Sequence, residues 1–258
     1  MIPTPIRQVL STIRKHQVQA LLMGGQACVF YGAAQFSKDV DLAVLADTGN
    51  YTRLLAALDE LGARRIAVPR FDPAVLARGH AVHFRCRAEG VQGLRVDIMT
   101  RLRDLPDVQT MWDRRTTIAD EDGNVFELLA VEDLVQAKKT QREKDWPVIS
   151  ALVEGHFRKF QREPTSARVH FWLRESRTPE RLCQLVSGFP SEAQVVLRDR
   201  PLLAQAFQGD LETLRAALDA EVRAEQAKDR AYWEPLRREL ETFRREELQG
   251  GTGTGIGG

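Results

Sequence analysis

The sequence predicts an α+β protein in which a mixed sheet flanked by helices is followed by a helical C-terminal domain. Short apolar runs with the period-two alternation of strands are confined to the first half of the chain. Apolar residues spaced three and four apart, the pattern of helices, dominate after residue 128. The chain has 258 residues, of which 43% are hydrophobic, enough for one large or two modest domains.

Composition narrows the class of protein. Lysine and arginine number 37 and aspartate and glutamate 36, so the net charge of +1 does not by itself call for nucleic acid or a membrane surface as partner. The three cysteines are too few and too scattered for a disulfide framework or a Cys-x-x-Cys metal site. No export signal or membrane-spanning run is recognisable, and we expect a cytoplasmic protein with no membrane partner.

The expected elements of the first half follow from these periodicities, with glycine and asparagine marking the turns. In order, they are a helix over 6–13, a strand over 20–23, a helix over 26–31, a strand over 39–44, a helix over 51–61, paired strands over 81–88 and 94–99, and a hairpin over 116–127.

The second half is expected to be helical. Two helices fill 128–152 with a stop and restart at 144–147, further helices open at Pro179 and Pro190, and 211–248 forms one helix or two broken near Pro235. The predicted domains are 1–127 for the sheet and 128–248 for the helices. The glycine-rich residues 249–258 cannot bury a core and are expected to be a disordered tail.

Two acidic residues alternate with apolar ones in the strand over 39–44. Residues i and i+2 of a strand project from the same face, so Asp39 and Asp41 point together while Val40 and Leu42 point to the core. A divalent cation would relieve the repulsion between two such carboxylates, and oxygen ligands favour Mg²⁺ or Mn²⁺. The alternative is a pair of solvated acids on an edge strand.

A third acid lies on a second predicted strand. Asp97 is flanked by aliphatic residues on both sides, so it too projects from a strand whose other face is buried. If the two strands are neighbours, the three carboxylates converge, an arrangement that can hold two metal ions for phosphoryl transfer. His80 and His83 are three apart on a predicted strand and face opposite sides. We therefore do not expect them to bind one metal ion together.

Two glycines follow the first strand directly. A turn at Gly24-Gly25 lacks Cβ atoms, so its backbone N–H groups can approach a phosphate chain at the start of the next helix. The alternative is a simple chain turn. The usual P-loop and dinucleotide-binding glycine patterns are absent.

Gly24-Gly25, thirteen residues, Asp39-x-Asp41 on a strand and the distant Asp97 together resemble the nucleotidyltransferases of the DNA polymerase beta-like superfamily. The run Ser37-Lys38-Asp39-Val40-Asp41-Leu42 and the later Val131 to Lys138 are most similar to minimal bacterial enzymes of the abortive-infection (AbiEii-type) toxin group. The resemblance covers roughly residues 19–150. Gln35 departs from it, since relatives often have arginine there, and Gly25 replaces a frequent serine.

The resemblance implies an NTP-dependent nucleotidyltransferase with Mg²⁺ or Mn²⁺ as cofactor. By it, Asp39, Asp41 and Asp97 are the catalytic metal ligands, and the nucleotide-binding residues are Gly24, Gly25, Ser37, Lys38, Lys138 and Asp145. Lys138 lies on the apolar side of its predicted helix, where a solvated lysine is out of place. A lysine whose stem snorkels from that face, and an Asp145 that only caps a helix, are the alternatives.

The acceptor implied by the resemblance is the 3′ end of a tRNA, which would make the protein a toxin of a toxin-antitoxin system with an antitoxin partner. Two alternatives remain open. One is the same chemistry on a small molecule such as an aminoglycoside or on a protein side chain. The other is a nucleotide-binding module without catalytic activity.

Overall fold

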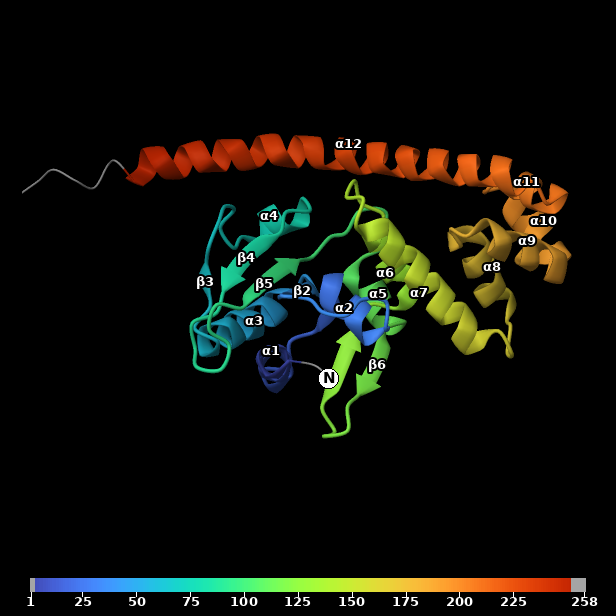
Figure 1. Ribbon diagram of the computed structural model, residues 1–258. Helices are drawn as coiled ribbons and strands as arrows, with labels where there is room; N and C mark the ends of the chain where they lie inside the picture. Colours follow the sequence, from blue (N-terminus) through green and yellow to red (C-terminus); the bar gives the residue numbers. More distant parts are fainter. Residues whose placement is uncertain (1–2, 252–258) are drawn as a thin grey trace, which may run out of the picture. The chain divides into compact units, whose positions relative to one another are not determined.

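The computed structural model describes residues 3–251, which form two compact units (Figure 1). We call them the sheet unit, with residues 3–27, 36–130 and 231–251, and the helical unit, with residues 28–35 and 131–230. The predicted α+β class, a mixed sheet flanked by helices with a helical C-terminal region, is confirmed. Within residues 3–251, no helix is both long and apolar enough to cross a membrane.

A seven-stranded sheet with the order β3-β4-β5-β2-β1-β7-β6 forms the centre of the sheet unit. Its strands are β1 (Ala20–Met23), β2 (Asp39–Val44), β3 (Arg64–Arg65), β4 (Val82–Arg85), β5 (Arg95–Met99), β6 (Thr116–Ala119) and β7 (Val125–Leu128). The pairs β2–β5 and β1–β7 are parallel and the others antiparallel, so the sheet is mixed. The expected hairpins over 81–99 and 116–127 are both present as antiparallel pairs.

Twelve helices surround the sheet or build the helical unit in the described part of the chain. The sheet unit holds α1 (Thr4–Lys15), α3 (Thr48–Glu60), α4 (Pro73–Ala77) and α5 (Val108–Asp113). The helical unit holds α6 (Val131–Lys138), α7 (Asp145–Phe160), α8 (Ser166–Glu175), α9 (Pro179–Gly188), α10 (Pro190–Leu197) and α11 (Leu203–Gln208). Helices α2 (Gly24–Phe30) and α12 (Leu211–Gly251) each run from one unit into the other.

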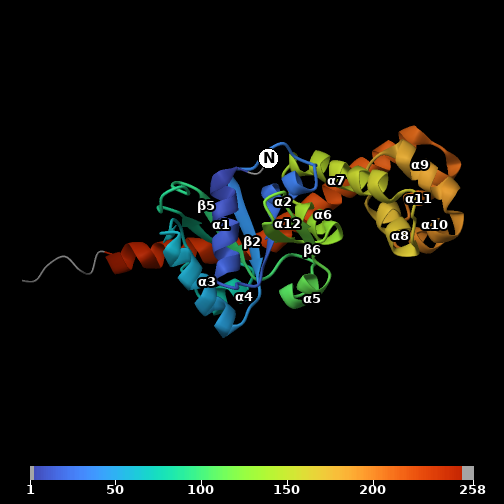
Figure 2. The same ribbon diagram turned by 90° about the horizontal axis from the view of Figure 1, so that it is seen from below.

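The alternation in β2 decides how the sheet is covered. Val40, Leu42 and Val44 are at most 1% exposed, whereas Asp39 and Asp41 are half-buried. Helices α1 and α3 lie side by side over the strands and contact each other (Figure 2). Leu10 and Ile13 of α1 line the same cavity as Leu42, so α1 lies over the apolar face. The acidic face is therefore the opposite one.

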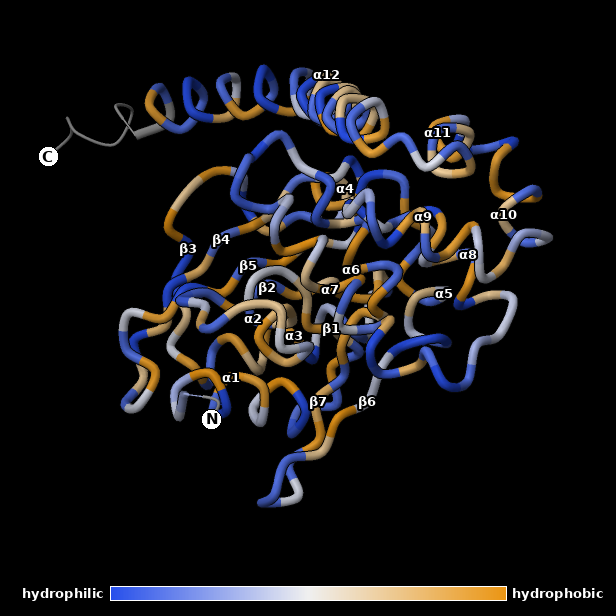
Figure 3. Tube along the Cα trace, turned by 45° about the vertical axis from the view of Figure 1, so that its right-hand side comes forward, coloured by the Kyte–Doolittle hydropathy of each residue, from blue (hydrophilic) through white to orange (hydrophobic). Residues whose placement is uncertain are grey.

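Helix α12 continues through Pro235 as a single element, so the alternative of a break there is wrong. Along α12, hydrophilic and apolar stretches alternate (Figure 3), and its buried residues include Leu214 and Leu218 in the helical unit and Leu236 in the sheet unit.

The last part of α12 belongs to the sheet unit, which differs from the predicted domain division. Glu239 of α12 accepts a hydrogen bond of 2.5 Å from His80 and one of 2.8 Å from Arg78, and the ring of Phe243 packs against His80. These contacts join residues about 160 positions apart and cannot be inferred from local periodicity. Residues 249–251 end α12, and the rest of the predicted tail, 252–258, lies outside the described residues.

Candidate active site

The acidic face of β2 lies at the centre of the sheet. With three strands on either side of it, β2 is not an edge strand, so the alternative of solvated acids on an edge is wrong. Asp39 and Asp41 project from the face opposite to the buried Val40 and Leu42. The strand thus holds two carboxylates side by side on a rigid element.

The register between β2 and β5 brings the third acid next to them. The two strands are parallel neighbours (Figure 1), with Asp41 opposite Asp97 and Asp39 opposite Arg95. Residues that are directly opposite on adjacent strands project from the same face. Asp39, Asp41 and Asp97 therefore share one face of two neighbouring strands.

Asp97 is already bonded on both oxygens. Arg95 donates from Nε to Oδ1 at 2.7 Å and from Nη2 to Oδ2 at 2.8 Å, and Nδ1 of His83 lies 2.9 Å from Oδ1. The Asp97 side chain is 13% exposed and that of Arg95 37%. Burial alone would raise the pKa of Asp97, but the bonds from His83 and Arg95 outweigh it and lower this pKa overall.

Sequence reasoning missed Arg95 and His83. Arg95 precedes Asp97 by two residues on the same strand, so the alternation that placed Asp97 on this face also places Arg95 there. His83 sits opposite Asp97 on the antiparallel β4, and no local pattern shows that pairing. The expectation that His80 and His83 do not pair agrees with His80 bonding to Glu239 instead.

The paired glycines lie against the acidic face. Gly24 has a φ of +67°, and a Cβ atom added there would lie 1.9 Å from Oδ2 of Asp41. A Cβ atom on Gly25 would lie 2.7 Å from the Ser37 hydroxyl. Gly24 is thus favoured by its backbone conformation and by its close approach to Asp41, whereas a side chain at Gly25 would have to displace the Ser37 hydroxyl.

Ser37 and Lys38 directly precede β2 in the sequence. The hydroxyl of Ser37 donates to the backbone carbonyl of Asp39 at 3.3 Å, which ties the segment to the start of the strand. The side chain of Lys38 is exposed. Their predicted role in nucleotide binding stays a prediction.

The donor set suits a hard divalent cation. Carboxylate oxygens are the ligands that Mg²⁺ and Mn²⁺ prefer, and the absence of a Cβ atom on Gly24 lets Oδ2 of Asp41 lie close to the glycine backbone. Between residues 3 and 251, no three His, Cys, Asp or Glu side chains stand at the spacing of a metal site. Because both oxygens of Asp97 accept bonds from Arg95, a cation shared by Asp97 and Asp41 would have to approach the carboxylate close to the guanidinium. The metal-binding role of the acids stays a prediction.

Lys138 and Asp145 belong to the helical unit and contact each other. Nζ of Lys138 donates to Oδ1 of Asp145 at 3.2 Å, and both residues are buried. Asp145 also accepts bonds from Thr140 at 2.5 Å and Arg142 at 2.7 Å, so it links side chains rather than only capping α7. Burial would raise the pKa of Asp145, but Lys138, Thr140 and Arg142 lower it overall.

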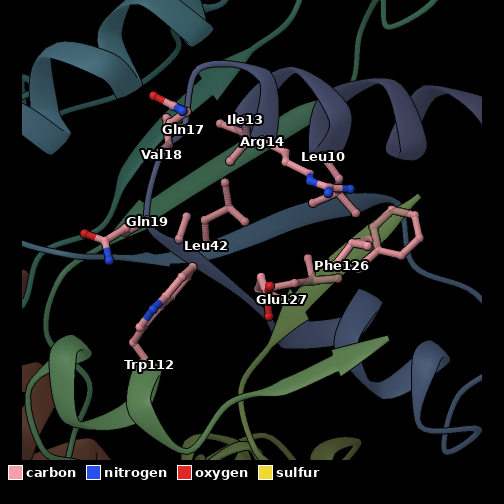
Figure 4. Close-up of a pocket in the computed structure, with 13 residues that line it drawn as sticks. Leu10, Ile13, Arg14, Gln17, Val18, Gln19, Leu42, Trp112, Phe126 and Glu127 are labelled. Atoms are coloured by element: carbon pink, nitrogen blue, oxygen red, sulfur yellow. The ribbon is translucent and has the colours of Figure 1, made fainter. Parts of the chain in front are cut away.

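A cavity of about 200 Å³ lies on the other face of the sheet. Leu42 points into it from β2, Ile13 from α1 and Trp112 from α5 (Figure 4). Because Leu42 and Asp41 alternate along β2, this cavity is separate from the acidic face.

No model of a known protein family matches the sequence, and no curated protein matches it. Among solved structures, the chain is similar to the solution structure of the antibiotic-resistance factor ANT(2'')-Ia. The match has 14% sequence identity and a TM-score of 0.34, and it covers 87% of this chain and 95% of the other. Similarity at this level does not show a shared activity.

Proposed function

We propose that this protein is a divalent-metal-dependent nucleotidyltransferase that moves NMP from an NTP to an acceptor hydroxyl. The observation that supports the proposal is the register of β2 and β5, which puts Asp41 opposite Asp97 with Asp39 on the same face. Three carboxylates from two strands, beside a glycine turn that approaches one of them, fit the needs of phosphoryl transfer from a triphosphate.

The reaction needs few groups from the protein. The acceptor oxygen forms a bond to the α-phosphorus, the bond from that phosphorus to the bridging oxygen breaks, and pyrophosphate leaves. The hydroxyl proton goes to a base, and we assign this role to Asp97 in addition to metal binding. A divalent cation, when bound, neutralises charge on the attacking and leaving oxygens.

The chain's own residues then have distinct tasks. Asp39 and Asp41 would hold the cation, and the backbone of Gly24 and Gly25 would approach the phosphates, helped by Ser37. Lys138 and Asp145 are proposed to contribute to nucleotide binding, with Asp145 orienting the Lys138 ammonium through their hydrogen bond.

The finer parts of the proposal concern the acceptor. A tRNA 3′ end, with a toxin role, an antitoxin partner and a cytoplasmic location, is the version implied by resemblance. A small molecule such as an aminoglycoside and a protein side chain are the other acceptors that the chemistry permits, because each offers a nucleophilic hydroxyl.

The test is transfer of label from each of the four α-labelled NTPs, with Mg²⁺ and with Mn²⁺. Purified tRNA, an aminoglycoside panel and the protein itself serve as acceptors. We expect label on one acceptor class and release of pyrophosphate, both abolished in the double variant Asp39→Ala, Asp41→Ala. If no label is transferred and calorimetry shows no metal-dependent NTP binding, the proposed nucleotidyltransferase activity is wrong.

A further inference from the structure

Arg95 occupies an unusual place for a proposed metal site. Its guanidinium holds both oxygens of Asp97 in a bidentate ion pair at 2.7 and 2.8 Å, while its Nη2 lies 3.0 Å from Nδ1 of His83. Its register partner on β2 is Asp39. The guanidinium thus lies on the same face as all three acids.

Charge makes Arg95 and a divalent cation compete. Both are attracted by the same three carboxylates, and the charges of Asp39 and Asp41 act on Arg95 through space. A cation that shares Asp97 with Asp41 would stand close to the guanidinium, where like charges repel strongly. The two therefore cannot hold the Asp97 carboxylate in the same way at the same time.

The environment of Arg95 permits its release. Its side chain is 37% exposed, in contrast with 13% for Asp97, so the guanidinium can turn toward solvent while the carboxylate stays on the sheet. The planar fork of an arginine also matches phosphate oxygens as well as carboxylate oxygens. A triphosphate that arrives with the metal therefore offers Arg95 a second anionic partner.

We propose that Arg95 is a displaceable counter-ion that holds Asp97 in the ligand-free protein and passes to the triphosphate when a divalent cation takes Asp97. Arg95 thereby couples metal binding to nucleotide binding: each ligand removes one half of the Arg95–Asp97 pair and favours the other. This inference rests on the proposed nucleotidyltransferase function and names a further triphosphate-binding residue for it.

The test is the affinity of the full chain for Mn²⁺, measured by electron paramagnetic resonance of the free ion without nucleotide. Arg95→Gln removes the competitor, so we expect about fivefold tighter Mn²⁺ binding. The affinity for nucleotide should change in the opposite direction. We expect Arg95→Gln to bind an α,β-methylene NTP analogue about fivefold more weakly than the unmodified protein does.

Two further variants separate this mechanism from a general charge effect. Arg85 is the β4 neighbour of Arg95 in register and is exposed, so Arg85→Gln removes the same charge one strand further from the acids. We expect it to change Mn²⁺ affinity less than about twofold. Arg95→Lys keeps the charge but not the fork, and we expect tighter Mn²⁺ binding than in the unmodified protein.

The outcomes are distinct. Equal or weaker Mn²⁺ binding by Arg95→Gln, or an equal gain in Arg85→Gln, overturns the inference and leaves Arg95 as a fixed structural partner. If the unmodified protein binds Mn²⁺ no better than Asp41→Ala does, the proposed function fails and the inference with it. Thermal unfolding of each variant checks that it folds. If Arg95→Gln does not fold, the Mn²⁺ affinity of Arg95→Lys tests the inference in its place.

Discussion

The acidic face of the sheet unit and a buried ion cluster in the helical unit use the same residue types in opposite ways. In the cluster, Glu221 bonds to Arg200 at 2.7 Å and to Arg177, and Glu175 bonds to Lys139 at 2.8 Å. Arg200 also donates to the backbone carbonyls of residues 173 and 176. On the acidic face, three carboxylates share Arg95, which is bonded directly to Asp97.

The difference lies in compensation and exposure. Burial would raise the pKa of Glu221, but its bond to Arg200 and the neighbouring cations lower this pKa overall. Arg200 is 5% exposed, and each charge of the cluster has an opposite partner, as a structural ion network requires. On the acidic face three carboxylates face the single Arg95, and Asp39 and Asp41 are only half-buried. The acidic face and the buried cluster should therefore respond differently to loss of a carboxylate.

The largest effect is expected for Asp39→Asn. The substitution removes the charge of a proposed metal ligand, so label transfer should fall about a thousandfold or more. The free energy of unfolding should change by less than about 0.5 kcal/mol, or rise, because a like-charge contact is relieved. Transfer assays and urea unfolding measure both. Asp59→Asn, an equivalent change on the exposed side of α3, should leave both unchanged; similar loss in the two variants would contradict the assignment.

Glu221→Gln should do the opposite and mainly affect stability. It leaves Arg177 and Arg200 buried without their main anionic partner, which should cost about 3 kcal/mol of unfolding free energy. The matched control is Glu180→Gln, because Glu180 pairs with Arg215 at 3.6 Å with both side chains at least 58% exposed. That change should cost less than about 0.5 kcal/mol. Equal losses in urea unfolding would show that the cluster is not a structural network.

Gly24→Ala should lower both stability and activity. The φ of +67° costs an alanine about 1 kcal/mol, and its Cβ would push Asp41 away, so we expect about 2 kcal/mol in total and at least about tenfold slower transfer. Gly32→Ala is the control, since Gly32 has a φ of +72° with nothing within 4 Å of an added Cβ. It should cost about 1 kcal/mol without slowing transfer. If both variants transfer label at the same rate, the close approach to Asp41 has no functional role.

The elements of the acidic face were predictable because each depends on local alternation. Period two in residues 39–44 and 95–99 fixes which side chains face the core, and only two strands had to be neighbours for Asp97 to join Asp39 and Asp41. The same rule applied to Arg95 would have revealed the counter-ion. A search for metal ligands considers only the acidic residues of the strand and therefore passes over Arg95.

Other features depend on pairing between distant residues and could not be predicted. The spacing of His83 from His80 does not reveal its neighbours, because the antiparallel register of β4 and β5 places it opposite Asp97. The final part of α12 belongs to the sheet unit through the bonds of Glu239 to Arg78 and His80. Neither the register nor these bonds leave a periodic signal in the sequence.

The smallest expected effect is a pH dependence in the helical unit, at the half-buried side chain of His156. Burial first, and then the charges of Arg168 and Lys159, lower the pKa of His156 from 6.5 to about 4. Its Nδ1 accepts a hydrogen bond of 2.8 Å from Nε1 of Trp172, which fits the neutral ring. Between pH 6.5 and 4 the unfolded chain therefore binds a proton that the folded chain does not.

Stability should consequently be lost as the pH falls through this window. Because His156 is only half-buried, we expect about 1 to 2 kcal/mol rather than the full value of the pKa shift. Urea unfolding monitored by tryptophan fluorescence at pH 7 and pH 4.5 measures the loss. His156→Gln keeps a hydrogen-bond acceptor but cannot titrate, so its pH slope should be shallower, whereas His170→Gln should keep the original slope. Equal slopes in all three proteins would show that His156 is protonated as easily in the folded chain as in the unfolded one.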